Sequence, residues 1–416
     1  MHLTIELFLV IIVGFVMAWA VGANDVANAM AGTVGSKTLT VRDAVIVAAL
    51  FEAMGAMLAS GQVTNMIRYG IIDIQVFTDQ LSVFVIGMLS ALMSAATWLL
   101  IATYNGWPVS TTHSIIGAVL GFGLVGVGYQ HILWGSLLNI AMSWVLTPIV
   151  AIMLAYNIFT MVSYIILASN NPLSRAEWLI PVCMALLVLI FSGVTIFQGL
   201  TTIGVQLGPG QQYSVVAVAV ILTFMIGRRC VCKDLKKAKS SSQEEQLQVV
   251  EAKFGILSVM TAASMAYAHG SNDVANAIGP VAAVAQVVYE GALSQGATIP
   301  AWVIGLGASG IVLGLVMYGY KIMQTVGTGI TQLTPSRGFC AQFSTSVIIV
   351  VASGLGYPVS TTQTMVGAIL GVGLARGMAA LNMKVIKNIF VSWVITLPIG
   401  AIFSGIYFLL LWNILT

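Results

Sequence analysis

The chain has 416 residues and carries a formal net charge of only +3. Hydrophobic residues make up 59% of it and charged residues 7%, and the mean hydropathy is +1.00. A soluble globular domain carries about 25% charged residues, so this composition excludes a soluble protein and indicates one embedded in a membrane.

Apolar stretches long enough to cross a bilayer as helices recur along the whole chain. They lack the alternation of a β-barrel, so we expect an all-α polytopic membrane protein. The first stretch, from Met1 to Val21, has neither a basic start nor a cleavage site, so we interpret it as a spanning helix and not as a signal peptide. The expected spans are residues 3–34, 42–61, 134–168, 178–200, 213–228, 254–289, 300–320 and 385–413.

Two further segments, residues 81–128 and 322–375, each have two apolar arms around a polar centre that contains proline. Irregular backbone at membrane depth is tolerated only where it faces protein or a water-filled cavity. Each segment is therefore predicted to be a re-entrant helical hairpin.

The segment 228–253 is rich in charged residues and serine, and is predicted to be a flexible linker. The positive-inside rule places it in the cytoplasm, together with every Lys and Arg of the chain except Arg68. Both termini are then expected outside. Cys230 and Cys232 lack further Cys or His neighbours, so we interpret them as reduced or acylatable cytoplasmic thiols and not as a metal site.

Two polar motifs each occur twice. Asn24 to Ala29 is repeated as Asn272 to Ala277, and Pro108 to Thr112 as Pro358 to Thr362. With the expected topology the two copies enter the membrane from opposite faces, as inverted-topology repeats, which are typical of secondary transporters. The predicted parts are a first repeat (1–168), linking transmembrane helices (169–227), the linker (228–253) and a second repeat (254–416).

The Asn-Asp motif has the chemistry of a cation site. Asp25 and Asn28 lie three residues apart and share one face of a helix, and the second copy repeats this spacing. Carboxylate and amide oxygens are hard ligands that suit hard cations. The predicted residues for sodium or protons are Asp25, Asp273, Asn24, Asn28, Asn272, Asn276 and Glu52.

The Pro-Val-Ser-Thr-Thr motif is predicted to form the tip of each hairpin, before helices that begin near Ser114 and Thr364. Proline suits a first turn, and Ser and Thr cap it, so the free amides, hydroxyls and helix dipole together form an anion site. The interiors of the spans contain Asp25, Asp273 and Glu52 but no Lys or Arg. Lys and Arg occur only at or near the ends of the spans, so an anion beside these carboxylates requires a cation or proton, which indicates cation-coupled anion uptake.

Other polar residues allow two interpretations. Glu52 either binds a proton or cation, or is a protonated carboxyl bonded to a neighbouring helix; His269 either tunes Asp273 or packs locally. His113 follows the first tip, but Gln363 replaces it in the second, so an imidazole is not required at both. Arg337 fits topology or gating better than substrate binding. Ser110 and His113 have no nucleophile elbow, so we expect no enzyme.

At these residues the sequence resembles the inorganic phosphate transporter (PiT) family, over nearly the whole chain apart from the linker. The resemblance implies phosphate symport with sodium or protons, an inverted-repeat fold, and a homodimer. It implies phosphate contact at Ser110, Thr111, Thr112, Ser360, Thr361 and Thr362, and cation or phosphate coordination at Asp25, Asn28, Asp273 and Asn276. Gln363 and Gln342 depart from the family pattern, which often has His and Glu there.

Three alternatives remain open: sulfate symport on the same fold, a passive anion channel, and an ion receptor without transport. The sequence favours neither sodium nor proton, since both suit a site of carboxylates and amides. No cofactor and no nucleic-acid partner is expected. A plasma membrane, most simply a bacterial inner membrane, is the expected location.

Overall fold

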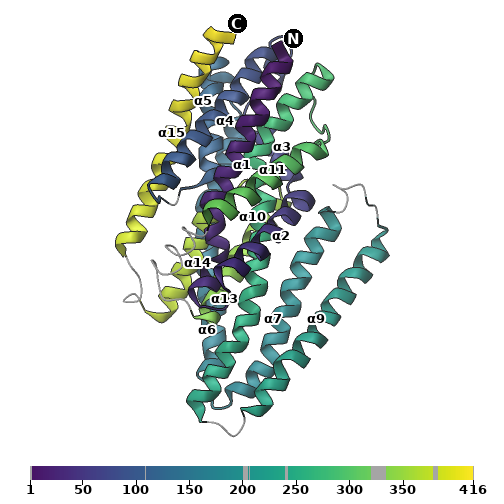
Figure 1. Ribbon diagram of the computed structural model, residues 1–416, viewed down its shortest axis with the longest axis vertical. Helices are drawn as coiled ribbons and strands as arrows, with labels where there is room; N and C mark the ends of the chain where they lie inside the picture. Colours follow the sequence, from purple (N-terminus) through teal and green to yellow (C-terminus); the bar gives the residue numbers. More distant parts are fainter. Residues whose placement is uncertain are drawn as a thin grey trace.

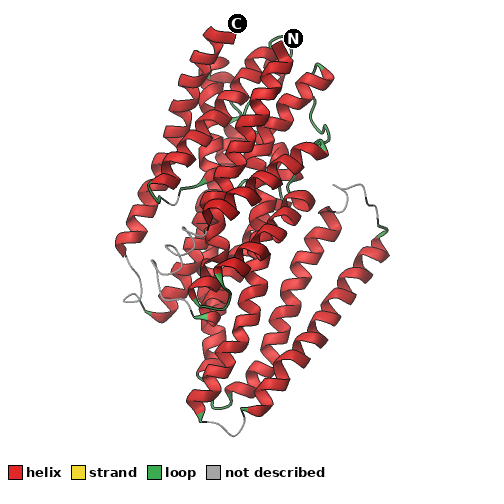
Figure 2. Cartoon of the chain, viewed as in Figure 1, coloured by secondary structure: helices red, strands yellow, loops and turns green. Residues whose placement is uncertain are grey.

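The computed structural model is helical throughout the part of the chain that it describes (Figure 2). The described residues are 2–107, 109–199, 205, 207–238, 242–319, 334–377 and 383–415. Among them, eight helices are long and apolar enough to cross a membrane, and a bent pair makes a ninth candidate. The all-α polytopic class expected from the sequence is confirmed.

The first copy of the duplication contains α1 to α6. Their bounds are α1 His2–Gly35, α2 Val41–Ala59, α3 Gly61–Tyr69, α4 Leu81–Tyr104, α5 Thr111–Gly126 and α6 Trp134–Val162, with short turns at Ile74–Phe77 (η1), Tyr129–His131 (η2) and Ser163–Leu167 (η3). The helix expected over 42–61 is followed by α3 after a bend of 63°. Ser60 donates a hydrogen bond to the carbonyl of Ala56 at 2.6 Å, and such bonding beside Gly61 favours a bend.

The remaining helices form a separate pair and the second copy. The pair is α7 Pro172–Val194, followed by the turn Thr195–Gly199 (η4), and α9 Pro209–Lys237. The second copy contains α10 Gln243–Glu290, α11 Ala301–Gly314 with the turn Leu315–Gly319 (η5), α13 Pro335–Gly354, α14 Thr361–Arg376 and α15 Met383–Leu415. Residues 320–333 lie outside the described residues, and they include the first part of the second predicted hairpin (322–375).

The segment predicted as a flexible linker is mostly helical. α9 continues to Lys237, and α10 begins at Gln243, within the range 228–253. Ser242 and Glu245 form a capping box at the start of α10, in which each side chain accepts a hydrogen bond from the other's backbone amide. The loss of apolar sequence therefore marks the end of the apolar span and not the end of the helix.

The two hairpins lie in opposite halves of the molecule. Figure 1 shows α4 and α5 in its upper half and α13 and α14 in its lower half. Both termini lie at the upper end, and the end of α9 and the start of α10 lie at the lower end (Figure 1). This arrangement is consistent with inverted repeats, and it puts the termini at the end opposite the linker.

Four glycines show how closely the two copies correspond. A Cβ atom on Gly22 would lie 2.0 Å from the carbonyl oxygen of Ile311, and one on Gly270 would lie 2.2 Å from that of Glu52. Gly314 and Gly55 meet the carbonyl oxygens of Trp19 and Tyr267 in the same way, each at 2.0 Å. The contact between α1 and α11 therefore corresponds to the contact between α10 and α2. Glu52 in α2 corresponds to Ile311 in α11.

The copies also exchange helices around the hairpins. Gly117 and Gly121 of α5 lie against the backbone of α15, while Gly367 and Gly371 of α14 lie against the backbone of α6. Small residues permit such close approach of helices in membranes. Each hairpin is therefore held by the last helix of the opposite copy, and the two halves form one interlocked core.

Replacing Gly314 by alanine is expected to destabilise the protein by about 1–3 kcal/mol, because its Cβ would overlap the backbone of α1 and force the helices apart. Gly305→Ala is a matched control in the same helix, because no atom lies within 4 Å of the added methyl group. It should be neutral or slightly stabilising. Thermal unfolding in detergent distinguishes the two, and equal melting temperatures would contradict the close contact.

Candidate functional site

Both Pro-Val-Ser-Thr-Thr motifs form capped helix starts. The Ser110 side chain accepts a hydrogen bond from the backbone amide of His113 at 3.2 Å, and the Ser360 side chain accepts one from Gln363 at 3.2 Å. The helices begin at Thr111 and Thr361, three residues earlier than expected. The threonines are therefore in the first helical turn, where backbone amides are free to bind an anion.

The two tips meet in the core of the protein. Thr112 of the first hairpin donates a hydrogen bond to the carbonyl of Val359 at 3.0 Å, and Thr362 of the second donates to the carbonyl of Val109 at 3.5 Å. The exchange is reciprocal, as expected for two equivalent tips. Ser110, Thr111, Thr112 and Ser360, Thr361, Thr362 are all buried. The expected convergence of the tips is thus observed.

The Asn-Asp motif helices α1 and α10 supply acidic and amide groups to these tips. Thr362 donates to Asp25 at 3.3 Å, and Thr361 donates to Asp273 at 2.7 Å. Asn276 donates to the hydroxyls of Thr111 at 3.2 Å and Thr112 at 3.3 Å. The predicted cation and anion residues therefore form one site. The side chain of Asn28, the counterpart of Asn276, lies outside the described part.

Asn24 and Asn272 fasten each motif helix to its own hairpin. The Asn24 amide donates to the Thr103 hydroxyl at 2.8 Å, near the end of α4. The Asn272 amide donates to the Ser353 hydroxyl at 3.0 Å and to the carbonyl of Tyr357 at 3.2 Å, near the end of α13. The motif predicts these asparagines as cation ligands, but it does not show that their amide groups bind the hairpin arms.

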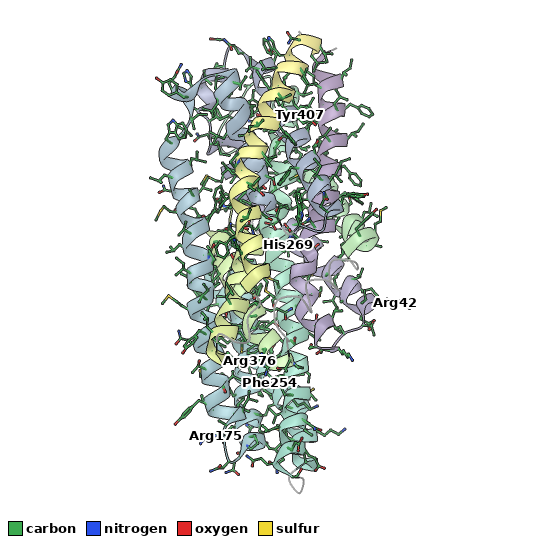
Figure 3. The ribbon with its side chains drawn as sticks, turned by 90° about the vertical axis from the view of Figure 1, so that its left-hand side faces the viewer. Arg42, Arg175, Phe254, His269, Arg376 and Tyr407 are labelled. Atoms are coloured by element: carbon green, nitrogen blue, oxygen red, sulfur yellow. The ribbon has the colours of Figure 1, made fainter. Side chains whose placement is uncertain are left out.

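His269 joins the remaining two acidic groups. Its Nδ1 lies 2.9 Å from Oε1 of Glu52, and its Nε2 lies 2.9 Å from Oδ2 of Asp273. All three side chains are fully buried, and Figure 3 shows His269 near the middle of the long axis. His269 contacts Asp273, as the first of its two interpretations requires. Glu52 contacts a neighbouring helix, as the second of its own interpretations requires.

The Glu52–His269–Asp273 bridge constrains the charge at the site. A neutral imidazole has a single N–H group, so its two contacts with carboxylates require two protons among the three side chains. Wherever these protons lie, the three groups together carry one negative charge. Asp25 alone also carries one negative charge when ionised. With Asp25 ionised, the surroundings of the two aspartates thus carry the same net charge, although their residues differ.

The bridge lies beside Asp273 and has no counterpart beside Asp25. The glycine contacts align Gly22 with Gly270 and Ile311 with Glu52, so the residue that corresponds to His269 is Val21. An apolar pair, Val21 of α1 and Ile311 of α11, therefore stands beside Asp25 in place of the imidazole and the second carboxylate. The motifs are repeated, but the residues that surround the two aspartates are not.

Several oxygen atoms at the site have no hydrogen-bond partner among the described residues. They are Oδ2 of Asp25, Oδ1 of Asp273, Oδ1 of Asn272 and Oδ1 of Asn276, and all are buried. Buried polar atoms are normally satisfied, so a group of unsatisfied acceptors suits a cation. A carboxylate oxygen of Asp25 and one of Asp273 also lie within 4.8 Å of each other. Such oxygen atoms suit a hard cation such as sodium.

His113 and Gln342 have other surroundings. The His113 ring centroid lies 3.9 Å from that of Trp144, whose indole donates to the carbonyl of Pro358 at 3.0 Å. Gln342 donates to the carbonyl of Ala29 at 2.8 Å and accepts from Thr261 at 3.2 Å. His113 therefore packs behind the tips, and the buried amide of Gln342 bonds to neighbouring helices through both its nitrogen and its oxygen.

Comparison with known proteins agrees with this geometry. Residues 21–404 match the model of the phosphate transporter family. The chain is 46% identical to a Haemophilus influenzae protein whose name assigns it to the phosphate permeases, over 96% of this chain and 94% of the relative. It is 39% identical to the chloroplastic inorganic phosphate transporter 2-1 of Arabidopsis thaliana, over 95% of this chain and 70% of the relative. A solved structure described as a sodium-dependent phosphate transporter aligns with a TM-score of 0.90 and 37% identity, over 98% of this chain and 99% of the other.

Proposed function

Because the chain belongs to the phosphate transporter family, we propose that it is a symporter that imports inorganic phosphate together with sodium ions. One observation carries this proposal: two hairpin tips meet two buried aspartates. Both tips are capped helix starts, and neither contains a basic residue. The tips suit an anion, and the aspartates suit the cations that must accompany it. The function is transport, with no chemical step.

Phosphate is proposed to bind between the two tips. The hydroxyls of Ser110, Thr111, Thr112, Ser360, Thr361 and Thr362, with the amide groups of Asn28 and Asn276, are the proposed contacts. The free backbone amides at the starts of α5 and α14 and the positive ends of their dipoles add to them. Unlike sulfate, phosphate keeps a hydroxyl that can donate a hydrogen bond to Asp25 or Asp273, which favours phosphate as the substrate.

Sodium is proposed to bind at Asp25 and Asp273, with Asn24, Asn28, Asn272, Asn276 and Glu52 in the same region. The buried acceptor oxygens without partners support this assignment. A single negative charge around each aspartate would be offset by one monovalent cation beside it. Each bound sodium would also draw on the membrane potential, by about 2.3 kcal/mol per charge per 100 mV.

The protein is a multi-pass membrane protein. We further propose an inner-membrane or plasma-membrane location with both termini outside and the α9–α10 connection in the cytoplasm, because this orientation places nearly all Lys and Arg residues inside. A homodimer is proposed from the family resemblance. Alternating access would come from movement of one repeat against the other around the central site.

Uptake of labelled phosphate into proteoliposomes tests the function. An inward sodium gradient is expected to drive phosphate accumulation above equilibrium, and an excess of external sulfate should leave the uptake nearly unchanged. A proton gradient without sodium, and liposomes without protein, serve as controls. Accumulation driven by the proton gradient alone would show that protons, and not sodium, are the coupling ion. Uptake that is independent of both gradients would indicate a channel. Full inhibition by sulfate, together with accumulation of sulfate, would indicate a sulfate symporter.

A further inference from the structure

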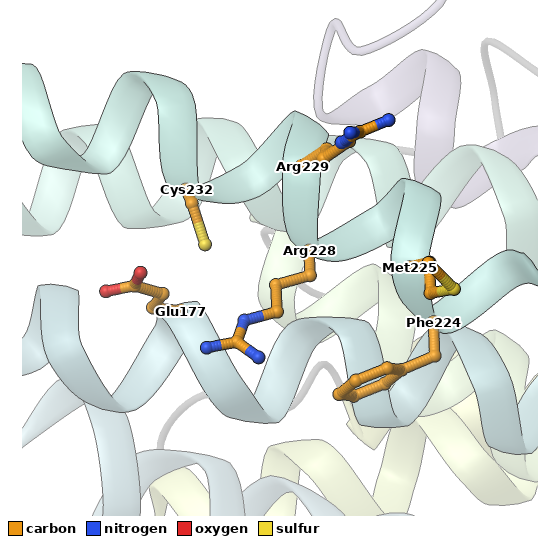
Figure 4. Close-up of a pocket in the computed structure, with 6 residues that line it drawn as sticks. All are labelled: Glu177, Phe224, Met225, Arg228, Arg229 and Cys232. Atoms are coloured by element: carbon orange, nitrogen blue, oxygen red, sulfur yellow. The ribbon is translucent and has the colours of Figure 1, made fainter. Parts of the chain in front are cut away.

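A cavity of about 380 Å³ lies between α7 and α9, away from the transport site (Figure 4). The two helices run antiparallel, since Gly227 near the end of α9 lies against Pro181 and Met184 in the first half of α7. The cavity is lined by Glu177, Phe224, Met225, Arg228, Arg229 and Cys232. It combines an acidic group, basic groups and an apolar side.

The charged groups face one another across the gap between the helices. Figure 4 shows Glu177 of α7 and Arg228 of α9 extending into the same space, while Arg229 points away from it. The Cys232 thiol interacts with both Glu177 and Arg228. A ligand in this space therefore meets a carboxylate on one helix and a guanidinium on the other.

The apolar side of the cavity continues onto a surface suited to lipid. Met225 is 58% exposed, and Val218, Ile221 and Leu222 on the same helix are each more than half exposed. Only 17% of the residues in the most apolar part of α9 are buried, as expected for a span that faces acyl chains. Arg175 and the 65%-exposed Trp178 flank Glu177, and basic and aromatic residues are typical of the boundary between membrane and water.

We propose that this cavity binds the headgroup of an aminophospholipid such as phosphatidylethanolamine. The phosphodiester accepts hydrogen bonds from Arg228, the ammonium group donates to Glu177, and an acyl chain lies along Phe224 and Met225. Charge-assisted hydrogen bonds of this kind are the strong ones. A choline headgroup has no N–H to donate, and a glycerol headgroup offers Glu177 only neutral hydroxyls and no positive charge to balance the phosphodiester. The cavity should therefore prefer ethanolamine over both.

Lipid binding to the purified, delipidated protein tests this proposal by native mass spectrometry with added phosphatidylethanolamine, phosphatidylcholine or phosphatidylglycerol. The wild-type protein should retain the ethanolamine lipid best. Arg228→Gln is expected to weaken its binding about fivefold, the contribution of one base near a membrane surface. Glu177→Gln should weaken ethanolamine-lipid binding and strengthen phosphatidylglycerol binding. Arg42→Gln, an exposed base on α2 and not on α7 or α9, is the control and should change neither.

Retention of the three lipids to the same extent by the wild-type protein would overturn the proposal without any variant. An unchanged lipid preference in Glu177→Gln would also overturn it, because the carboxylate is the only group assigned to the ammonium. Competition by soluble glycerophosphoethanolamine as strong as that by the whole lipid would show that the apolar side is not used, which contradicts acyl-chain contact. Size-exclusion chromatography checks the folding of each variant.

Discussion

Asp25→Asn is expected to reduce sodium-driven phosphate uptake by about a hundredfold or more, while the protein stays folded. The substitution keeps the shape of the side chain and one oxygen, so the contact with Thr362 at 3.3 Å can persist. It removes the carboxylate of the first Asn-Asp motif, and with it the negative charge beside Thr362. A buried cation that loses its counter-charge is disfavoured by several kcal/mol, and phosphate then lacks a neutralising partner.

The uptake is measured in proteoliposomes under an imposed sodium gradient, with thermal unfolding in detergent as the check on folding. Asp79→Asn, an exposed residue in the loop before α4, is the control and should keep full uptake. Asp273→Asn should reduce uptake in the same way as Asp25→Asn. Normal sodium-driven uptake by folded Asp25→Asn protein would refute the role assigned to this carboxylate.

Much of the fold was predictable because apolarity and duplication are both visible in the sequence. The long helices, the two helical pairs with proline-bearing tips, and their meeting in the core are confirmed. The start of α10 was placed at residue 254, although the helix begins at Gln243. The error arose because apolar sequence marks only the part of a helix that lies inside the membrane, whereas a capping box can start the helix in water.

The chemical groups of the site were also predictable, but their pairing was not. The repeated motifs identified Asp25, Asp273 and the tip hydroxyls, since polar residues in apolar sequence are costly. Nothing in the spacing shows that Asn24 bonds Thr103 or that Asn272 bonds Ser353, because these partners are about 80 residues away in sequence. A signal did exist: Thr103 and Ser353 precede their tip motifs by the same number of residues.

The bridge between Glu52 and Asp273 was missed for a related reason. The charge balance counted only Lys and Arg as bases and so left out His269, although it lies three residues before the second motif. Its contact with Glu52 depends on the close approach of α2 and α10, which Gly55 and Gly270 permit. Such an approach is visible only once the helices are placed in space.

His269→Val is expected to destabilise the protein by about 3–5 kcal/mol, because it leaves Glu52 and Asp273 as two buried acids without the group between them. The surroundings of Asp25 offer the compensating change, since Val21 and Ile311 occupy the corresponding positions there. The double variant His269→Val with Glu52→Ile should therefore recover most of the lost stability, because Asp273 then has no second carboxylate beside it, like Asp25.

The free energy of unfolding of the wild-type protein, both single variants and the double variant forms a complete cycle. Glu52→Ile alone keeps the His269–Asp273 contact of 2.9 Å, so its cost should be smaller than that of His269→Val. A large favourable coupling energy between positions 52 and 269 is the expected result. If the losses of the single variants instead add in the double variant, the three side chains do not act as one charged unit, and the equal charge around the two aspartates no longer follows.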